Sequence, residues 1–116
     1  MPILNTQTVQ IASGQSLSPE VDIYPGTLVG IFLPSTWTSA SVTFQASPDG
    51  GVTWGELYNY ATAEVTFTGA ASTFVQIDPT QWKGVNALKI RSGTPGSPVT
   101  QTSTVTITLI TRQMVS

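Results

Sequence analysis

The residues of this sequence that could carry out chemistry are few. Carboxylates are the main candidates, because a glycosidase needs two of them about 5 to 9 Å apart as acid and base. The six are Glu20, Asp22, Asp49, Glu56, Glu64 and Asp78, and their spacing singles out no pair. The chain has no histidine and no cysteine, which removes the commonest general base, the usual nitrogen and sulfur metal ligands and any Ser–His nucleophile. We therefore expect no catalytic residue, no metal site, no cofactor and no enzymatic activity.

Charge is sparse along the whole chain. Charged residues make up 9% of the sequence, against about 25% in an ordinary soluble domain. Nucleic-acid binding needs clustered cations to neutralise phosphates, and a net charge of −2 argues against it. Threonine and serine must supply most of the polar surface. This composition indicates either strands rich in threonine or a neutral surface suited to repeated contacts, and the sequence leaves both interpretations open.

The sequence offers no segment for membrane insertion or export. No apolar run approaches the roughly 20 residues of a membrane-spanning helix. The first 14 residues lack the basic region and the long apolar region of a signal peptide. We expect cytoplasmic synthesis and no membrane partner.

The dominant pattern is alternation of apolar and polar residues, which is typical of half-buried strands. It is clearest at 41–46, 88–91 and 104–109, where Leu88 and Ile90 point inward and Lys89 and Arg91 point outward. Weaker versions occur at 8–11, 20–23, 64–67 and 73–77, whereas 28–33 is nearly all apolar and predicts a central strand covered on both faces. The sequence therefore predicts an all-β protein, with residues 1–116 forming a single antiparallel β-sandwich or jelly-roll of about eight strands.

Turn signals separate the strands. One short helical turn is expected near 79–83, because Asp78 can cap it, Pro79 suits its first position and Gly84 can end it. Residues 93–100, rich in glycine and proline, predict the longest loop. Residues 1–5 could form an arm outside the core, and a frayed terminus is the alternative.

The segment from Ser47 to Trp54 resembles the Asp box, a hairpin motif of sialidases and many other β proteins. The residues that match are Ser47, Asp49, Gly51, Thr53 and Trp54. Asp49 can accept hydrogen bonds from turn amides, and the glycines can adopt positive φ. In the families that carry it the box is a folding element, so we predict a structural turn. Calcium or glycan contact through Asp49 is the alternative.

Aromatic residues are the remaining candidates for binding. Trp37, Trp54, Trp82, Tyr24, Tyr58 and Tyr60 could stack on sugar rings, although such residues are more often core or interface anchors. The residues predicted to contact a partner are Pro2, Ile3, Leu4, Trp37, Tyr58, Tyr60 and Trp82.

Three segments taken together resemble the head decoration, or cement, proteins of tailed bacteriophages. They are residues 42–51, Asp78-Pro79, and residues 88–94 with Pro98-Val99 after them. The resemblance implies a small β-sandwich on the capsid surface of the virion, made in the host cytoplasm and bound to the major capsid protein. It also implies a homotrimer, with a homodimer as the alternative. A competing hypothesis is a carbohydrate-binding module of a phage tail fibre or baseplate protein, with the aromatics and residues 93–100 facing sugar.

Overall fold

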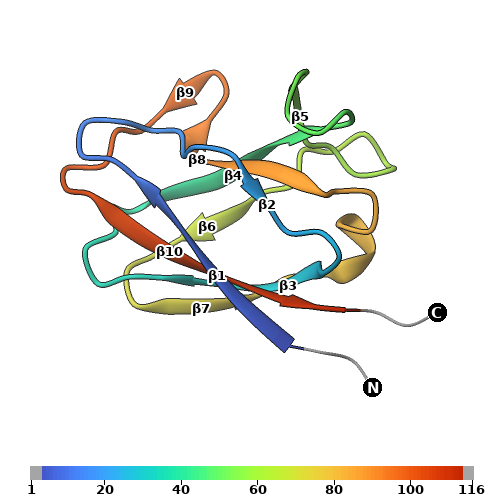
Figure 1. The fold of residues 1–116 in the computed structure, drawn as a ribbon. Coiled ribbons are helices and arrows are strands. Elements are labelled where there is room, and N and C mark those ends of the chain that lie inside the picture. The colour runs from blue at the N-terminus through green and yellow to red at the C-terminus, as the bar shows by residue number, and fades with distance from the viewer. Residues whose placement is uncertain (1–3, 114–116) are drawn as a thin grey trace.

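The computed structural model describes residues 4–113, which form two antiparallel sheets packed face to face (Figure 1). The first sheet has the strand order β1-β10-β3-β7. Its strands are β1 (Leu4–Ile11), β10 (Val105–Arg112), β3 (Thr27–Leu33) and β7 (Thr73–Gln76).

The second sheet has the order β2-β8-β4-β5, with β6 also pairing with β4 and β9 with β8. Its strands are β2 (Val21–Asp22), β8 (Ala87–Thr94), β4 (Ala40–Ser47), β5 (Gly55–Glu56), β6 (Phe67–Gly69) and β9 (Ser97–Pro98). The predicted all-β sandwich is confirmed. The described residues contain ten strands rather than about eight, because β5 and β9 are two-residue strands that the alternation does not reveal.

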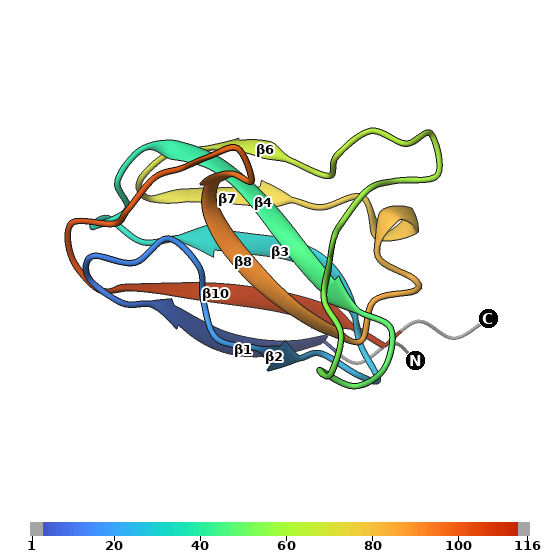
Figure 2. The same ribbon diagram turned by 90° about the horizontal axis from the view of Figure 1, so that it is seen from above.

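The core lies between the sheets (Figure 2). In β10 the alternation predicted at 104–109 places Val105, Ile107 and Leu109 in the core, each fully buried, while the intervening residues Thr106 and Thr108 point away. The same rule gives the inward side of β8 and β4, so that apolar side chains from both sheets meet. Burial of this apolar area is the main force that holds the layers together.

The helical turn η1 (Pro79–Gln81) is a 3-10 turn that is shorter than the predicted 79–83. The Asp78 carboxylate caps it by accepting the Thr80 N–H at 3.0 Å. The turn ends at Trp82, whose N–H donates to the Pro79 carbonyl at 3.0 Å, and not at Gly84. Within residues 4–113, no helix is long or apolar enough to cross a membrane.

Strand β3 is covered on one face only, so the prediction of burial on both faces is wrong. Ile31 and Leu33 are buried, whereas Phe32 points to the opposite side and is 39% exposed. The pairing with β10 shifts at Ile110/Thr111, where Val29 is the extra residue of a β-bulge in β3. The second sheet packs over the side of β3 that carries Ile31 and Leu33. On the outer side, the Phe74 ring of the neighbouring strand β7 lies over Gly30.

The expected loop at 93–100 is largely a tight hairpin. β8 continues to Thr94 and pairs with β9, which brings Gly93 opposite Pro98. Gly93 has φ +95, and a Cβ there would lie 2.6 Å from the Val99 nitrogen. The glycine therefore permits the hairpin, and the prediction of a long loop is wrong.

The expected arm at 1–5 is wrong for its last two residues. Leu4 pairs with Arg112 and Asn5 with Thr111, so both belong to β1. Strand pairing supplies backbone hydrogen bonds that an arm would leave to water. The first three residues, including Pro2 and Ile3, lie outside the described residues.

Candidate docking face and the Asp-box turn

The Asp-box segment forms the turn that follows β4. The Ser47 hydroxyl donates to Asp49 Oδ1 at 2.9 Å and accepts the N–H groups of Gly51 at 2.7 Å and Asp49 at 3.3 Å. Gly50 and Gly51 have φ +76 and +104, in the left-handed region that favours glycine. One buried hydroxyl thus organises the first half of the turn.

Asp49 organises the second half. Its Oδ1 accepts the Thr53 N–H at 2.8 Å and the Val52 N–H at 3.2 Å. These bonds, led by the one from Thr53, hold the pKa of Asp49 below its ordinary value. Trp54 closes the turn by donating from Nε1 to the Gly51 carbonyl at 3.1 Å, and Lys89 Nζ lies 4.5 Å from its ring centroid. The turn has the local hydrogen bonds predicted for a structural motif.

Replacing Ser47 with alanine is expected to lower the free energy of unfolding by about 1 to 2 kcal/mol. The substitution removes the hydroxyl that serves three hydrogen bonds, each worth about 1 kcal/mol net. Chemical denaturation measures the change. Val52→Ala is the matched control, because Val52 is 83% exposed and contributes only its backbone N–H. Equal stability of the two variants would show that the hydroxyl does not hold the turn.

Four of the six carboxylates have structural partners, namely those of Asp22, Asp49, Glu56 and Asp78. Glu56 forms a two-pronged ion pair with Arg91, with distances of 2.6 and 2.9 Å, and the Arg91 hydrogen bond holds the pKa of Glu56 below its ordinary value. Glu20 and Asp22 line one surface hollow, and Asp22 Oδ1 accepts the Tyr24 N–H at 3.0 Å. Among residues 4–113 there is no group of three or more acidic side chains that could hold a metal ion.

Arg91 lies on the predicted outward side of its strand but is buried there. It lies on the outer side of its sheet, opposite to Leu88 and Ile90, yet it is only 7% exposed. Thr43 and Glu56 hold its guanidinium flat against the sheet, with Thr43 Oγ1 at 3.4 Å. The cation is therefore committed to a structural pair and unavailable to a ligand.

Two of the predicted contact residues are core residues. Trp82 is 0% exposed and Trp37 is 4% exposed, so neither can contact a partner and that prediction is wrong for both. Trp82 packs edge-to-face on Phe44, with centroids 4.7 Å apart, and the Trp37 indole lies close against Gly69. Large aromatic side chains bury the most apolar area, which explains why the core takes them.

The other predicted contact residues that lie within the described part of the chain are exposed. Tyr60 is fully exposed at 101%, Leu4 is 55% exposed and Tyr58 is 53% exposed. Tyr60 lies in the turn that follows Tyr58. The Asn59 side chain caps this turn by accepting the N–H groups of Ala61 and Ala63 at 2.9 and 3.1 Å. The structure therefore separates Leu4, in the first sheet, from the two tyrosines near the second.

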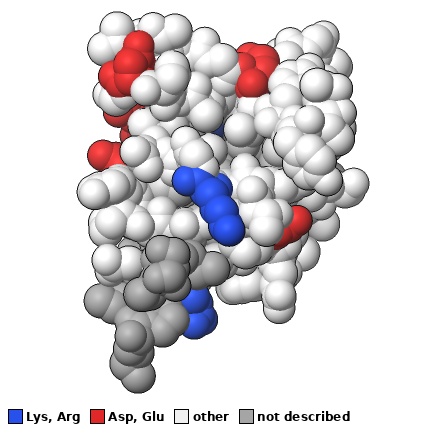
Figure 3. Space-filling model, turned by 90° about the vertical axis from the view of Figure 1, so that its right-hand side faces the viewer, with Lys and Arg blue, Asp and Glu red and all other residues white. Residues whose placement is uncertain are grey.

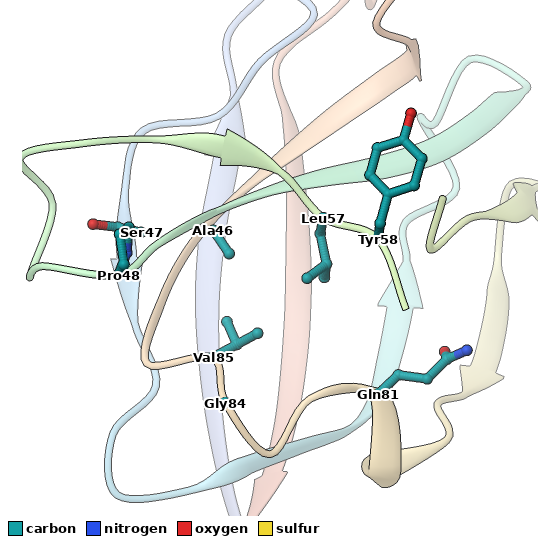
Figure 4. A pocket seen from close by; sticks show the side chains of 8 residues that line it. All are labelled: Ala46, Ser47, Pro48, Leu57, Tyr58, Gln81, Gly84 and Val85. Carbon is teal, nitrogen blue, oxygen red and sulfur yellow. The ribbon is translucent and has the colours of Figure 1, made fainter. Parts of the chain in front are cut away.

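A hollow of about 330 Å³ lies beside Tyr58. Its lining residues are Ala46, Ser47, Pro48, Leu57, Tyr58, Gln81, Gly84 and Val85. Figure 4 shows Leu57 and Val85 directed into this hollow and Tyr58 standing at its side. None of these residues is charged, so the hollow could hold a neutral ligand but has no acid or base.

The outer side of the β1-β10-β3-β7 sheet forms the most distinctive surface. The strand register aligns the outward residues in rows across the sheet. One row consists of Thr8, Thr108, Phe32 and Phe74, and the next of Thr6, Ile110, Gly30 and Gln76. We call these eight residues, together with Leu4, Gln10 and Thr106, the neutral face. The Phe74 ring lies over Gly30, where an added Cβ would come within 2.9 Å of it.

The neutral face is almost free of charge. The four strands contain no acidic residue, and their one basic residue is Arg112 at the end of β10. Arg112 borders a shallow hollow with Leu4, Val29, Phe74, Gln76 and Ile110. Figure 3 shows the adjoining end of the molecule, where charged side chains are isolated within uncharged surface. Exposed apolar groups surrounded by neutral polar ones typically mark an interaction surface.

Sequence reasoning did not single out Phe32 and Phe74, which the structure shows as exposed aromatic residues. The available signal was parity, because Phe32 alternates with the buried Ile31 and Leu33. The nearly all-apolar run 28–33 hides this alternation, because such a run predicts a strand covered on both faces. Only the strand order could show that Phe32 and Phe74 are cross-strand neighbours.

No protein-family model matches this sequence, and no curated protein matches it. Among solved structures, the crystal structure of the SPBc2 prophage-derived protein YomS has a TM-score of 0.61 at 15% sequence identity. The similarity covers 97% of this chain and 95% of that chain. The two chains share one fold. The crystal structure of the Yersinia pseudotuberculosis-derived mitogen YPM has a TM-score of 0.44 at 15% identity, covering 100% of this chain and 89% of that chain.

Proposed function

We propose that this chain is a non-enzymatic structural protein of a tailed-phage virion that binds the outer surface of the head and stabilises it. Its partner would be the major capsid protein, and its location the capsid surface. The alternative function is sugar binding.

The neutral face is the observation that carries this proposal. It is a broad, regular surface built on four paired strands, with Phe32 and Phe74 exposed at 39% and 55% as neighbours on its β3-β7 side. A few large aromatic side chains commonly supply much of the binding free energy of a contact. The surrounding threonines form hydrogen bonds without bringing charges that would need partners.

Two further lines support a phage origin. Residues 42–51, 78–79 and 88–94 resemble segments of head decoration proteins, and YomS, which has the same fold, is described as prophage-derived. A likeness at 15% identity is evidence of fold, so the proposed role depends on the surface and on the resemblance.

The mechanism would be stabilisation by mass action. A protein that binds the assembled shell but not its separated subunits shifts the equilibrium toward the shell. Each copy would lay its neutral face across neighbouring capsid subunits, and several copies on one particle would reinforce one another. Such a role needs no cofactor and no reacting side chain.

Purified protein is expected to bind expanded, undecorated heads of the phage that encodes it and to raise the temperature at which they rupture. Co-sedimentation measures binding, and release of packaged DNA on heating measures rupture. Heads that already carry their own decoration protein serve as the control and should bind little more. Failure to bind undecorated heads, with an unchanged rupture temperature, would contradict the proposal.

A carbohydrate-binding role is the second candidate, favoured by the exposed Tyr58 beside its uncharged hollow and by the fully exposed Tyr60. A glycan array tests it with Tyr58→Ala and Tyr60→Ala. Clear hits that both variants lose would favour this role over the capsid. Trp37 and Trp82 are unsuitable probes, because both are buried and their replacement would disturb the fold.

A further inference from the structure

Strand β1 forms one margin of the first sheet and has a neighbour on one side only. β10 pairs with it along all eight residues, from Leu4↔Arg112 to Ile11↔Val105. In an antiparallel pair, alternate residues direct their N–H and C=O groups away from the partner strand. Among residues 4–113, no hydrogen bond is made to these outward backbone groups of β1. Figure 2 shows β1 at the outer margin, followed by β10, β3 and β7.

The sequence of β1, LNTQTVQI, contains no charge, no proline and no glycine. Proteins commonly protect an exposed strand edge with lysine, proline, a bulge or short length, because an open edge pairs with other chains. The pairing of β1 with β10 is regular over all eight residues, and the bulge lies in the pairing of β10 with β3. β1 is therefore an open edge without any of these protections.

The other marginal strands of the described residues are protected by their length or composition. β7 has four residues and is followed closely by Asp78 and Pro79. β2 and β5 have two residues each, β6 has three, and β9 has two, of which one is Pro98. Since short strands make few hydrogen bonds to an added chain, β1 stands apart as the edge able to accept a full strand.

We propose that β1 pairs with β1 of a second copy of this chain, antiparallel about a two-fold axis. Such a contact uses the same surface on both subunits and closes on itself, so both open edges are satisfied by one interface. The two four-stranded sheets would join into one sheet of eight strands. A second copy fits this edge because β1 has no charged residue that would meet its own copy. The nearby Asp22 contacts β1 through its carbonyl, which accepts the Gln7 side chain at 3.0 Å, while its carboxylate accepts the Tyr24 N–H.

The side chains allow a specific register. Antiparallel neighbours must project on the same side of the sheet, and a register centred on Gln7 places Thr6 of one copy opposite Thr8 of the other. Leu4 then lies opposite Gln10. Threonine pairs on neighbouring strands are favourable. Because Arg112 pairs with Leu4, the two copies of this cation lie at opposite ends of the interface.

The inference goes beyond the proposed function and does not require it. If the neutral face does bind a capsid, the dimer would align two such faces in one continuous sheet, and the second contact would gain from the effective concentration set by the first. The dimer itself forms in free solution, where it can be measured without any capsid.

Light scattering during size-exclusion chromatography, over a hundredfold range of concentration, is expected to show the mass rising from 12.3 kDa toward twice that value. The variant Thr6→Lys/Thr8→Lys should remain monomeric throughout, because its lysines would face each other across the interface. Both side chains are exposed, so circular dichroism should show an unchanged fold. Ser39→Lys/Thr68→Lys is the matched control, with the same added charge at two exposed residues, one directly before β4 and one in β6. Since β6 lies on the side of the molecule opposite β1 (Figure 2), this variant should dimerise like the parent.

Amide hydrogen exchange provides a second measurement. Alternate β1 amides should exchange more slowly as the parent protein is concentrated, and not in the Thr6→Lys/Thr8→Lys variant. A monomer at every concentration, a trimer mass, or a dimer that the β1 lysines leave intact would each overturn the inference. Protection of β1 that appears only when capsids are added would overturn it too and would assign the edge to a capsid strand. Failure to bind capsids would leave the dimer result unaffected.

Discussion

Replacing Trp82 with alanine is expected to lower the free energy of unfolding by about 3 to 5 kcal/mol. The side chain is the largest of the fully buried ones, is 0% exposed and packs edge-to-face on Phe44. Alanine would remove this packing and leave a cavity that the two rigid sheets could close only in part. Since the total free energy of unfolding of a small domain is about 5 to 15 kcal/mol, this loss is a large share of the stability. Equilibrium denaturation in urea measures it.

Trp82→Phe is the matched control. It keeps an aromatic ring against Phe44 and removes the indole N–H, which has no hydrogen-bond partner among the described residues. We therefore expect a much smaller loss than for alanine. If alanine and phenylalanine cost the same, the edge-to-face packing would not be what makes Trp82 important. A loss below about 1 kcal/mol for alanine would contradict burial of the residue.

Replacing Phe74 with alanine is expected to weaken capsid binding by about thirtyfold or more, which corresponds to about 2 kcal/mol. Phe74 lies beside Phe32 on β7, the strand at one margin of the neutral face, and it is 55% exposed in the free protein. Its burial under a partner would therefore remove most of a large apolar ring from water. The free energy of unfolding should change by less than about 1 kcal/mol, because surface cross-strand pairs contribute little. Co-sedimentation with undecorated heads measures the affinity.

Tyr60→Ala is the control for this variant. Tyr60 is an aromatic residue with full exposure, but it lies in the turn after Tyr58 and not on the neutral face. The Tyr60→Ala variant should leave capsid binding unchanged. The reverse pattern, with binding lost in Tyr60→Ala and kept in Phe74→Ala, would contradict the assignment to the neutral face. It would indicate that the capsid contacts the turn that carries Tyr60.

The Asp-box turn shows which kind of site sequence alone can predict. All of its hydrogen bonds join residues within four positions of each other, from Ser47 to Trp54. Residue types at fixed spacing therefore specify the geometry, since nothing distant is needed to complete it. The same holds for the cap at Asp78, which reaches Thr80 two residues on.

Arg91 shows the opposite case. Its alternation with Leu88 and Ile90 correctly predicts the side of the strand on which it lies, but its burial depends on Glu56, 35 residues away. Trp37 and Trp82 follow the same logic, because an aromatic residue is compatible with a core or with a surface until its neighbours are known. No local pattern distinguishes these outcomes.

The sequence by itself determined that this chain is an all-β sandwich, because alternation fixes which side chains share a face of a strand. It also determined the local turns and, through the absence of histidine and cysteine, the narrow range of chemistry open to the chain. Only the tertiary structure decided which strands are neighbours and which sheet face is left uncovered. These depend on pairings between distant segments, such as Phe32 with Phe74 and β1 with β10. The neutral face and the open β1 edge, which carry both proposals, exist only once those pairings are made.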